Sequence, residues 1–139
     1  MLERTFCMIK PDALARGLKD QILGRLKEDG FNIIEEKELK LDRADAQKLY
    51  AVHQGKSFYA GLVNFITSGS AYLMVLKRED AVLKLRKLMG ATDPRQADAG
   101  TIRGDFKEDN IFNAEGIMKN LIHGSDSVEN AKYEISIFF

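Results

Sequence analysis

The chain has 139 residues, a length that fits one domain built around one core, so we expect a single domain over residues 1–139. Hydrophobic residues make up 45% of the chain and charged residues 30%, which is ordinary for a globular protein. The 21 acidic and 21 basic residues balance. This balance excludes a general electrostatic attraction to nucleic acid or anionic membrane, although a local basic pocket is still possible.

The one cysteine, Cys7, lies in the apolar run Thr5–Ile9. A single cysteine cannot form an intramolecular disulfide, which favours a compartment that keeps thiols reduced. A reactive thiol is one interpretation, but a buried strand residue fits the apolar neighbours better, because they keep the thiol protonated. The first residues lack the apolar core of a signal peptide, and no later apolar stretch is long enough to span a bilayer. We therefore expect a soluble, cytoplasmic protein.

The first third of the chain predicts two strands around one helix. Arg4–Lys10 is apolar at its centre and stops at Pro11, as a buried strand would. From Leu18 to Glu28 apolar residues recur at helical spacing and end before Gly30. Phe31–Leu41 carries β-branched residues at its centre and alternates near its end, which indicates a second strand.

The rest of the chain predicts two further strands and several helices. In chain order these are a short helix capped by Asp42 or Asp45, a helix over Phe58–Ile66, a strand over Ala71–Leu76, an amphipathic helix over Asp80–Met89, a helix begun by Asp126 or Ser127, and a strand over Glu134–Phe139. The main elements follow the order β-α-β, then β-α-β. This order predicts an α+β sheet of the split βαβ type.

Between Gly90 and Ser127 the periodicity fails. A structureless stretch of this length in a small domain is usually functional or disordered. Its side chains are too specific for a linker, because they include Thr92, Arg95, Arg103, Asp105, Asn120 and His123. We therefore expect the functional site in this stretch.

His123 is the candidate nucleophile. Neutral imidazole has a lone pair at pH 7 and can form a phosphoramidate that passes its phosphoryl group on. Such a histidine needs a partner to fix its tautomer, which could be the nearby Ser125 or Glu134 at the start of the predicted last strand. Gly124 would let a ligand approach the backbone. A lone histidine before a glycine is more often structural than catalytic, so these residues by themselves leave both interpretations open.

Phosphate binding requires cations on fixed stems. Arg103 stands beside Gly104, Arg86 projects from the amphipathic helix, and Lys10 ends the first predicted strand. Thr92 follows in the turn after that helix. Each of these residues alone has a structural explanation, as a solvated charge or the end of a strand. Four donors that meet a histidine in one irregular stretch predict a phosphate pocket.

Two common nucleotide-binding motifs are missing from the sequence, the Gly-x-x-x-x-Gly-Lys-Ser/Thr loop and the G-x-G-x-x-G fingerprint. Neither His53 nor His123 has cysteine partners at metal-ligand spacing, and the carboxylates are scattered. If the protein uses Mg²⁺ as a cofactor, we expect the ion to arrive with the nucleotide phosphates rather than in a site built by the protein.

Taken together, these residues resemble the nucleoside diphosphate kinase family. The matching segments run nearly from end to end: Glu3–Phe6, Met8–Asp12, Arg16–Leu18, Leu62–Val63 with Phe65, Thr67–Gly69, Gly90–Pro94, Gly100–Phe106 and His123–Glu129. The resemblance implies a ferredoxin-like βαββαβ sandwich, in which a four-stranded antiparallel sheet carries helices on one face. It also implies a phosphotransferase that moves the γ-phosphoryl group of a nucleoside triphosphate to a nucleoside diphosphate in a ping-pong reaction.

The resemblance assigns roles to particular residues. His123 would carry the phosphoryl group, supported by Glu134 and Ser125. The residues that bind phosphates and ribose would be Lys10, Tyr50, Arg86, Thr92, Arg103 and Asn120. Phe58 would stack on the base, and a stacked base with few edge contacts explains a broad choice of nucleotides. Tyr50 and Asn120 would align His123 with the phosphorus atom that it attacks. Mg²⁺ would be bound together with the nucleotide.

The sequence departs from the family pattern in four places. Ala13 stands where glycine is usual, and Ser57 and Ser70 replace prolines, which puts loop rigidity and subunit packing in question. The link over residues 107–119 is several residues longer than in the family. We expect its half from Phe112 to Met118 to pack over the nucleotide or a neighbouring subunit, and its half from Lys107 to Asn110 to be mobile.

Two other functions compete with this one. A catalytically silent family member could act as an interaction module, although the complete set of site residues argues against it. A nucleic-acid-binding ferredoxin-like domain would need basic residues and exposed aromatics on its sheet, whereas the pI here is about 6.7 and the strands read as core. We expect a homo-oligomer of unspecified size, with no membrane partner and no specific nucleic acid.

Overall fold

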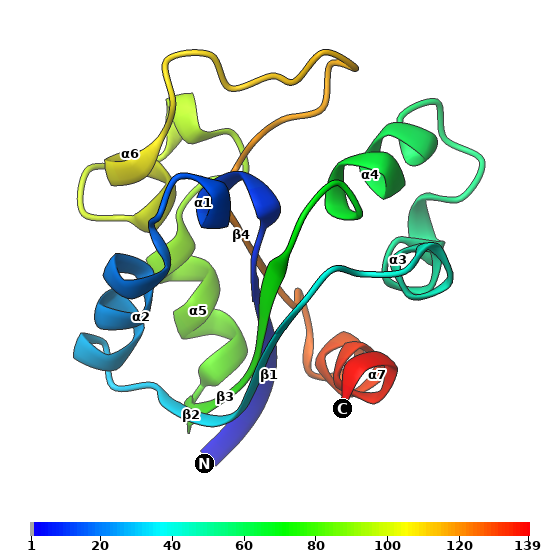
Figure 1. Cartoon of the computed structure of the whole chain (residues 1–139). Helices are drawn as coiled ribbons and strands as arrows, with labels where there is room; N and C mark the ends of the chain where they lie inside the picture. The colour runs from blue at the N-terminus through cyan, green and yellow to red at the C-terminus, as the bar shows by residue number, and fades with distance from the viewer. Residues whose placement is uncertain (1) are drawn as a thin grey trace.

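A computed structural model describes residues 2–139 and shows a four-stranded antiparallel sheet between two layers of helices (Figure 1). The strands are β1 (Leu2–Ile9), β2 (Asn32–Leu39), β3 (Ala71–Glu79) and β4 (Ile122–Gly124), in the order β2-β3-β1-β4. All three pairings are antiparallel, with Phe6 opposite Val75 and Met8 opposite His123. The α+β class and the ferredoxin-like sheet predicted from the sequence are confirmed.

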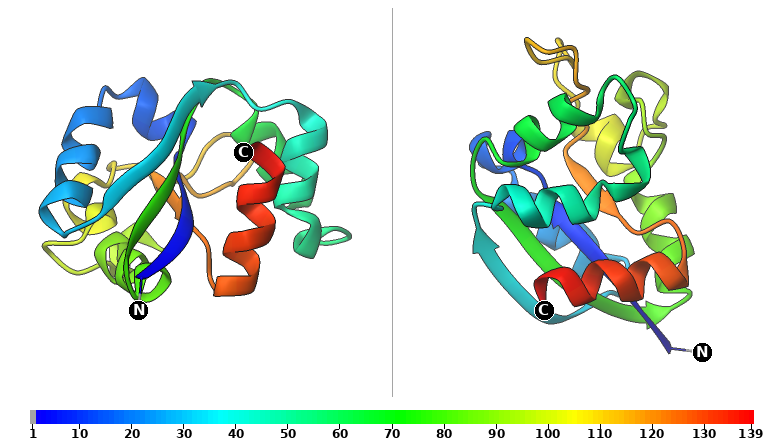
Figure 2. Two further views of the ribbon diagram at one scale, coloured as in Figure 1. Left: turned by 90° about the horizontal axis from the view of Figure 1, so that it is seen from below. Right: turned by 90° about the vertical axis from the view of Figure 1, so that its right-hand side faces the viewer.

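Helices cover both faces of the sheet, which corrects the expectation of one covered face (Figures 1 and 2). Because side chains alternate along a strand, Cys7 and Ile9 join one core cluster while Phe6 and Met8 join another. The first cluster lies under α1 (Pro11–Ala15), α2 (Lys19–Glu28), α5 (Ala81–Met89) and α6 (Ile102–Phe106). The second lies under α3 (Arg43–Leu49), α4 (Tyr59–Ile66) and α7 (Val128–Phe138).

The prediction of a fourth strand over Glu134–Phe139 is wrong, because these residues belong to helix α7. Ser127 begins the helix by accepting a hydrogen bond from the backbone N–H of Asn130 at 3.1 Å. Ala131, Glu134 and Phe138 are buried at spacings of three and four, as on the inner side of a helix. The fourth strand is instead β4, which brings His123 into the sheet beside β1.

The other predicted elements lie close to their expected places. The first helix corresponds to α2, the second and third strands to β2 and β3, and the amphipathic helix to α5. Asp42, rather than Asp45, caps α3, since its carboxylate accepts from the Asp45 N–H at 2.8 Å. The stretch without periodicity contains the short 3₁₀ helix η2 (Pro94–Gln96), helix α6 and strand β4. A second 3₁₀ helix, η1 (Ala51–His53), follows α3. Within residues 2–139 no helix has the length and apolar character needed to cross a membrane.

Candidate active site

A cleft of about 780 Å³ opens beside the ends of β1 and β4, a size typical of small-molecule sites. It draws residues from α3, α4, α5, α6 and α7, so both helical layers contribute to its walls. Nine of the ten predicted site residues line it: Lys10, Tyr50, Phe58, Arg86, Thr92, Arg103, Asn120, His123 and Glu134. The tenth, Ser125, is fully buried behind the wall, where it contacts Glu134.

His123 is held in a defined orientation by the carboxylate of Glu134. Its Nε2 lies 2.7 Å from Glu134 Oε1, and the Ser125 hydroxyl donates to the same oxygen at 2.7 Å. The imidazole ring also packs against Phe6, with ring centroids 5.8 Å apart. Both partners considered from the sequence are therefore present, with Ser125 acting through Glu134.

This arrangement determines which imidazole nitrogen can react. A carboxylate accepts hydrogen bonds and cannot donate them, so Glu134 selects the tautomer of neutral His123 that has its proton on Nε2. The lone pair is then on Nδ1. Glu134 can do this because it lies on the buried side of α7, where the residue is 8% exposed.

Lys10 is a buried cation at the end of β1. Its Nζ donates to Asn120 Oδ1 at 2.7 Å, and the Asn120 amide nitrogen donates to the Thr92 carbonyl at 3.1 Å. Burial, together with the nearby Arg103 charge, lowers the pKa of Lys10 to about 8. Three predicted site residues are thus joined in one chain of hydrogen bonds, and Lys10 remains mostly protonated at neutral pH.

Arg103 is buried in the wall of the cleft and binds three backbone carbonyls. Its Nε donates to Asn120 O at 3.0 Å, and its two terminal nitrogens donate to Gly90 O at 3.1 Å and Ile122 O at 2.7 Å. Burial and the neighbouring Arg86 charge lower its pKa to about 10. Since a guanidinium has five N–H groups, Arg103 can fix the strand that carries His123 and still present donors to an anion.

Tyr50 and Phe58 lie on the other side of the cleft, at the end of α3 and before α4. Burial raises the pKa of the Tyr50 phenol, and the Glu134 carboxylate adds to this shift. Phe58 is 42% exposed and makes an edge contact with His53, with ring centroids 5.3 Å apart. An exposed aromatic face in a cleft suits a flat, apolar ligand group such as a nucleobase.

The long link, residues 107–119, contributes part of the wall of the cleft. Phe112, Gly116, Ile117 and Met118 all line it. Phe112 and Met118 form an antiparallel bridge, and the Asn113 carboxamide oxygen accepts from the Ile117 N–H at 2.9 Å. Ile117 is buried, as expected for the half from Phe112 to Met118, whereas Phe112 is 38% exposed.

The long link is anchored on both sides of the cleft. Ile117 is buried against Gly61 of α4. A Cβ added to Gly61 would lie 2.8 Å from Ile117 Cδ1. Glu115 accepts from the Asn64 amide at 3.2 Å, and on the opposite side the Arg95 guanidinium lies 5.3 Å from the Phe112 ring centroid. The half expected to be mobile is held at Glu108 by an ion pair with Lys119 at 3.3 Å.

Asp12 and Leu121 support the site without having been singled out by the sequence. Leu121 has a φ of +77°, an unfavourable conformation for a residue with a branched side chain. Its N–H donates to Asp12 Oδ2 at 3.1 Å, and its carbonyl accepts from the Lys10 N–H at 2.9 Å. These two bonds hold the turn between Asn120 and His123 against the end of β1.

The residues of the cleft also indicate how a metal ion would be bound. Among residues 2–139 there is no group of three or more His, Cys, Asp or Glu side chains that could hold an ion. The carboxylates that line the cleft are Asp126 and Glu134, and Glu134 is already occupied by His123 and Ser125. Such a donor set fits Mg²⁺ that arrives with nucleotide phosphates, because Mg²⁺ is commonly bound by one or two carboxylates plus phosphates.

Comparisons with known proteins agree with this geometry. A family model described as nucleoside diphosphate kinase matches residues 3–139. The nucleoside diphosphate kinase of Anaeromyxobacter dehalogenans is 50% identical over 138 residues, which cover 99% of this chain and 89% of that protein.

Solved structures show the same similarity. The halophilic nucleoside diphosphate kinase of Halobacterium salinarum, in complex with CDP, has a TM-score of 0.89 at 44% identity and covers 100% of this chain and 88% of its own. A transition state mimic of the Borrelia burgdorferi enzyme, with bound vanadate and ADP, has a TM-score of 0.91 at 32% identity. That match covers 99% of this chain and 87% of the Borrelia chain.

Proposed function

This chain belongs to the nucleoside diphosphate kinase family, and on that premise we propose that it carries the γ-phosphoryl group between nucleotides on His123. The observation that supports this role most directly is the His123–Glu134 contact of 2.7 Å. It leaves the Nδ1 lone pair available on a residue that lines the cleft.

The reaction would proceed in two half-reactions. In the first, Nδ1 attacks the γ-phosphorus of a nucleoside triphosphate, the Nδ1–P bond forms, and the bond from γ-phosphorus to the bridging oxygen breaks. The nucleoside diphosphate leaves with that oxygen. In the second, the terminal oxygen of another nucleoside diphosphate attacks the phosphohistidine and the Nδ1–P bond breaks. No proton has to leave His123, because the attacking nitrogen carries none.

The cations of the cleft would stabilise the charge that develops on the moving group. Phosphoryl transfer depends mainly on positioning and on electrostatic stabilisation. Lys10, Arg86 and Arg103 line the same cleft as His123. Lys10 and Arg103 are both buried, where a charge acts more strongly than in water.

The remaining site residues would hold the nucleotide. Phe58 would stack on the base, and Thr92, Tyr50 and Asn120 would contact phosphates or ribose. Mg²⁺ bound to the phosphates would neutralise part of their charge. The nucleotide partners are supported by the CDP and ADP in the related structures. That the chain forms a homo-oligomer is a proposal that rests on the family. A cytoplasmic location is a proposal that rests on the family and on the free, buried thiol of Cys7.

The test is incubation with γ-labelled ATP, followed by a search for acid-labile label on the protein. We expect label on wild-type protein, its release on addition of a nucleoside diphosphate, and ping-pong steady-state kinetics. His123→Ala should stay folded by circular dichroism and take up no label. Sequential kinetics, or substantial transfer by His123→Ala, would contradict the proposal. A wild-type protein that binds nucleotide without taking up label would support the alternative, a silent interaction module.

A further inference from the structure

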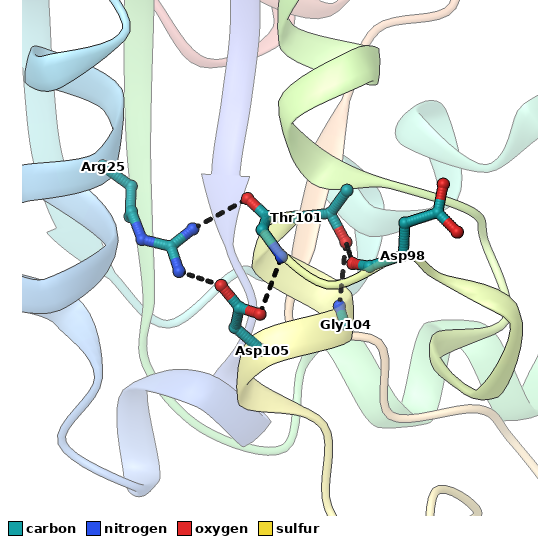
Figure 3. Close-up of polar contacts among 6 residues, drawn as sticks. Arg25, Asp98, Thr101, Gly104 and Asp105 are labelled. Carbon is teal, nitrogen blue, oxygen red and sulfur yellow. Dashed lines mark hydrogen bonds and ion pairs between the residues drawn. The ribbon is translucent and has the colours of Figure 1, made fainter.

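Arg103 acts from α6, a helix of only five residues. A helix this short is not stable by itself, so its position must be fixed by surrounding contacts. At its start, the Thr101 hydroxyl accepts from the Gly104 N–H at 3.1 Å and donates to the Asp98 carbonyl at 2.6 Å (Figure 3). These bonds tie the helix to the turn over residues 98–101, so the position of Arg103 depends on that turn.

An ion pair from outside the cleft holds this turn. Asp105 Oδ1 accepts from the Gly100 N–H at 2.9 Å, and its other carboxylate oxygen binds Arg25 of α2. Arg25 also donates to the Gly100 carbonyl at 3.1 Å. The two side chains therefore bind both backbone groups of Gly100, a residue whose φ is +92°.

The turn is closely packed against α6 and against the end of α5. A Cβ on Gly104 would lie 2.1 Å from the Asp98 carbonyl oxygen, and one on Gly90 would lie 2.6 Å from Thr101 Oγ1. At the end of α6, the Arg25 guanidinium lies 5.3 Å from the Phe106 ring centroid. A displacement of the turn must therefore be passed to α6 and to Arg103, since well-packed groups shift together.

We infer that Arg25 and Asp105 are positioning residues for phosphoryl transfer, which set the place of the Arg103 guanidinium through the Gly100 turn and α6. This inference rests on the proposed role of Arg103 in the cleft. Neither Arg25 nor Asp105 lines the cleft. Displacement of a catalytic group by about 1 Å can reduce a rate by about 100-fold, so a small shift of α6 is sufficient.

Arg78 on strand β3 offers a matched control for Arg25. Arg78 binds Asp29, just beyond the end of α2, at 3.4 Å and lies 5.2 Å from the Phe31 ring centroid. Its side chain is 22% exposed, against 26% for Arg25. Arg78→Gln therefore removes a similar ion pair and a similar ring contact without touching α6.

The experiment measures kcat, KM and the urea midpoint for Arg25→Gln, Asp105→Asn and Arg78→Gln, each alone and combined with Arg103→Lys. Asp105→Asn is nearly isosteric and keeps an oxygen for Gly100, so it guards against simple unfolding. We expect the first two variants to lower kcat by about 10-fold or more, and Arg78→Gln to leave it within about twofold. In the Arg103→Lys background, Arg25→Gln should cause little further loss of kcat, because both changes act on the same group.

Two results would overturn the inference. One is a kcat for Arg25→Gln equal to that of Arg78→Gln. The other is that Arg25→Gln lowers kcat by the same factor in Arg103→Lys as in the wild type. A failure of the proposed function is distinguishable from both, because it would appear as wild-type protein without label on His123.

Discussion

Lys10 and Asn120 are 110 positions apart in the chain, yet the Lys10 ammonium lies 2.7 Å from the Asn120 side-chain oxygen. The bond joins the end of β1 to the residue that precedes Leu121 and strand β4, which carries His123. It also buries a charge, and burial lowers the pKa of Lys10 to about 8. The charge of this cation therefore changes within the range of pH in which the enzyme can be assayed.

Activity should fall as pH rises through about 8, because Lys10 is cationic below its pKa and neutral above it. A profile of kcat/KM against pH measures this, since it reports groups of the free enzyme. Lys10→Arg serves as the control, because a guanidinium stays charged throughout this range. Its profile should lack the decline near pH 8, whatever its maximal activity. A decline at the same pH in Lys10→Arg would assign the titration to another group.

The same group predicts an opposite trend in stability. The pKa of Lys10 is about 8 in the folded chain and 10.5 ordinarily, so between these values the unfolded state binds more protons. Stability contributed by this group must then rise with pH across that window. Urea unfolding at pH 8 and pH 10, with Lys10→Met as reference, should show a larger gain for the wild type than for the variant. An equal change in both proteins would contradict this.

Glu134→Gln should reduce kcat by at least about 10-fold, a loss of about 1.4 kcal/mol in transition-state stabilisation. The amide can donate to Nε2, which would favour the tautomer with its proton on Nδ1 and block the attacking lone pair. Single-turnover labelling of His123 measures the step directly. Glu129→Gln, an exposed position in the first turn of the same helix, is the control and should label at the wild-type rate. Equal labelling rates in the two variants would remove Glu134 from the mechanism.

Phe58→Ala should raise KM for all nucleotides by similar factors, because a base–aromatic stack contributes about 1–3 kcal/mol with little dependence on the base. KM values for purine and pyrimidine diphosphates test this. Phe139→Ala removes an aromatic of similar exposure outside the cleft, 38% against 42%, and should leave KM unchanged. A strong new preference among bases would indicate edge contacts that the stacking model does not contain.

Deletion of Glu108–Glu115 should leave His123 able to take up label but raise nucleotide KM. The deletion removes Phe112 from the lining of the cleft and the Glu115–Asn64 bond that anchors Ile117 on α4. Replacement of the same residues by a Gly/Ser segment of equal length separates the effect of these contacts from that of loop length, which costs little. Both variants should behave alike. If neither changes KM, the long link is a passive surface loop.

Nine residues predicted from the sequence line one cleft, whereas the last part of the fold was predicted wrongly. The charged and polar ones among them stand out because phosphate chemistry demands particular side chains, while Tyr50 and Phe58 came from the resemblance to the family. The strand predicted at the end of the chain is a helix, and the error has a physical reason. Glu134–Ile137 alternates polar and apolar residues as a strand does, while the buried side of α7 contains a carboxylate, Glu134, that hides the helical pattern.

Other features could not be predicted from local patterns. Strand β4 has three residues, too few to show periodicity, and its pairing with β1 depends on the rest of the fold. The left-handed Leu121 is held by Asp12, far away in sequence. The network of Arg25 with Asp105 and Gly100 likewise depends on the packing of α2 against α6, which no spacing in the sequence reveals.

The position of β4 beside β1 has a consequence for the synthesis of the chain. A protein emerges from the ribosome with its N-terminus first, so β1 is synthesised long before its partner strand, Ile122–Gly124. Until then the β1 edge at Cys7–Ile9 lacks its partner strand, and an unpaired apolar edge invites association with other chains. The nascent chain therefore passes through an aggregation-prone interval, which ends when β4 and α7 close the sheet and bring Glu134 to His123.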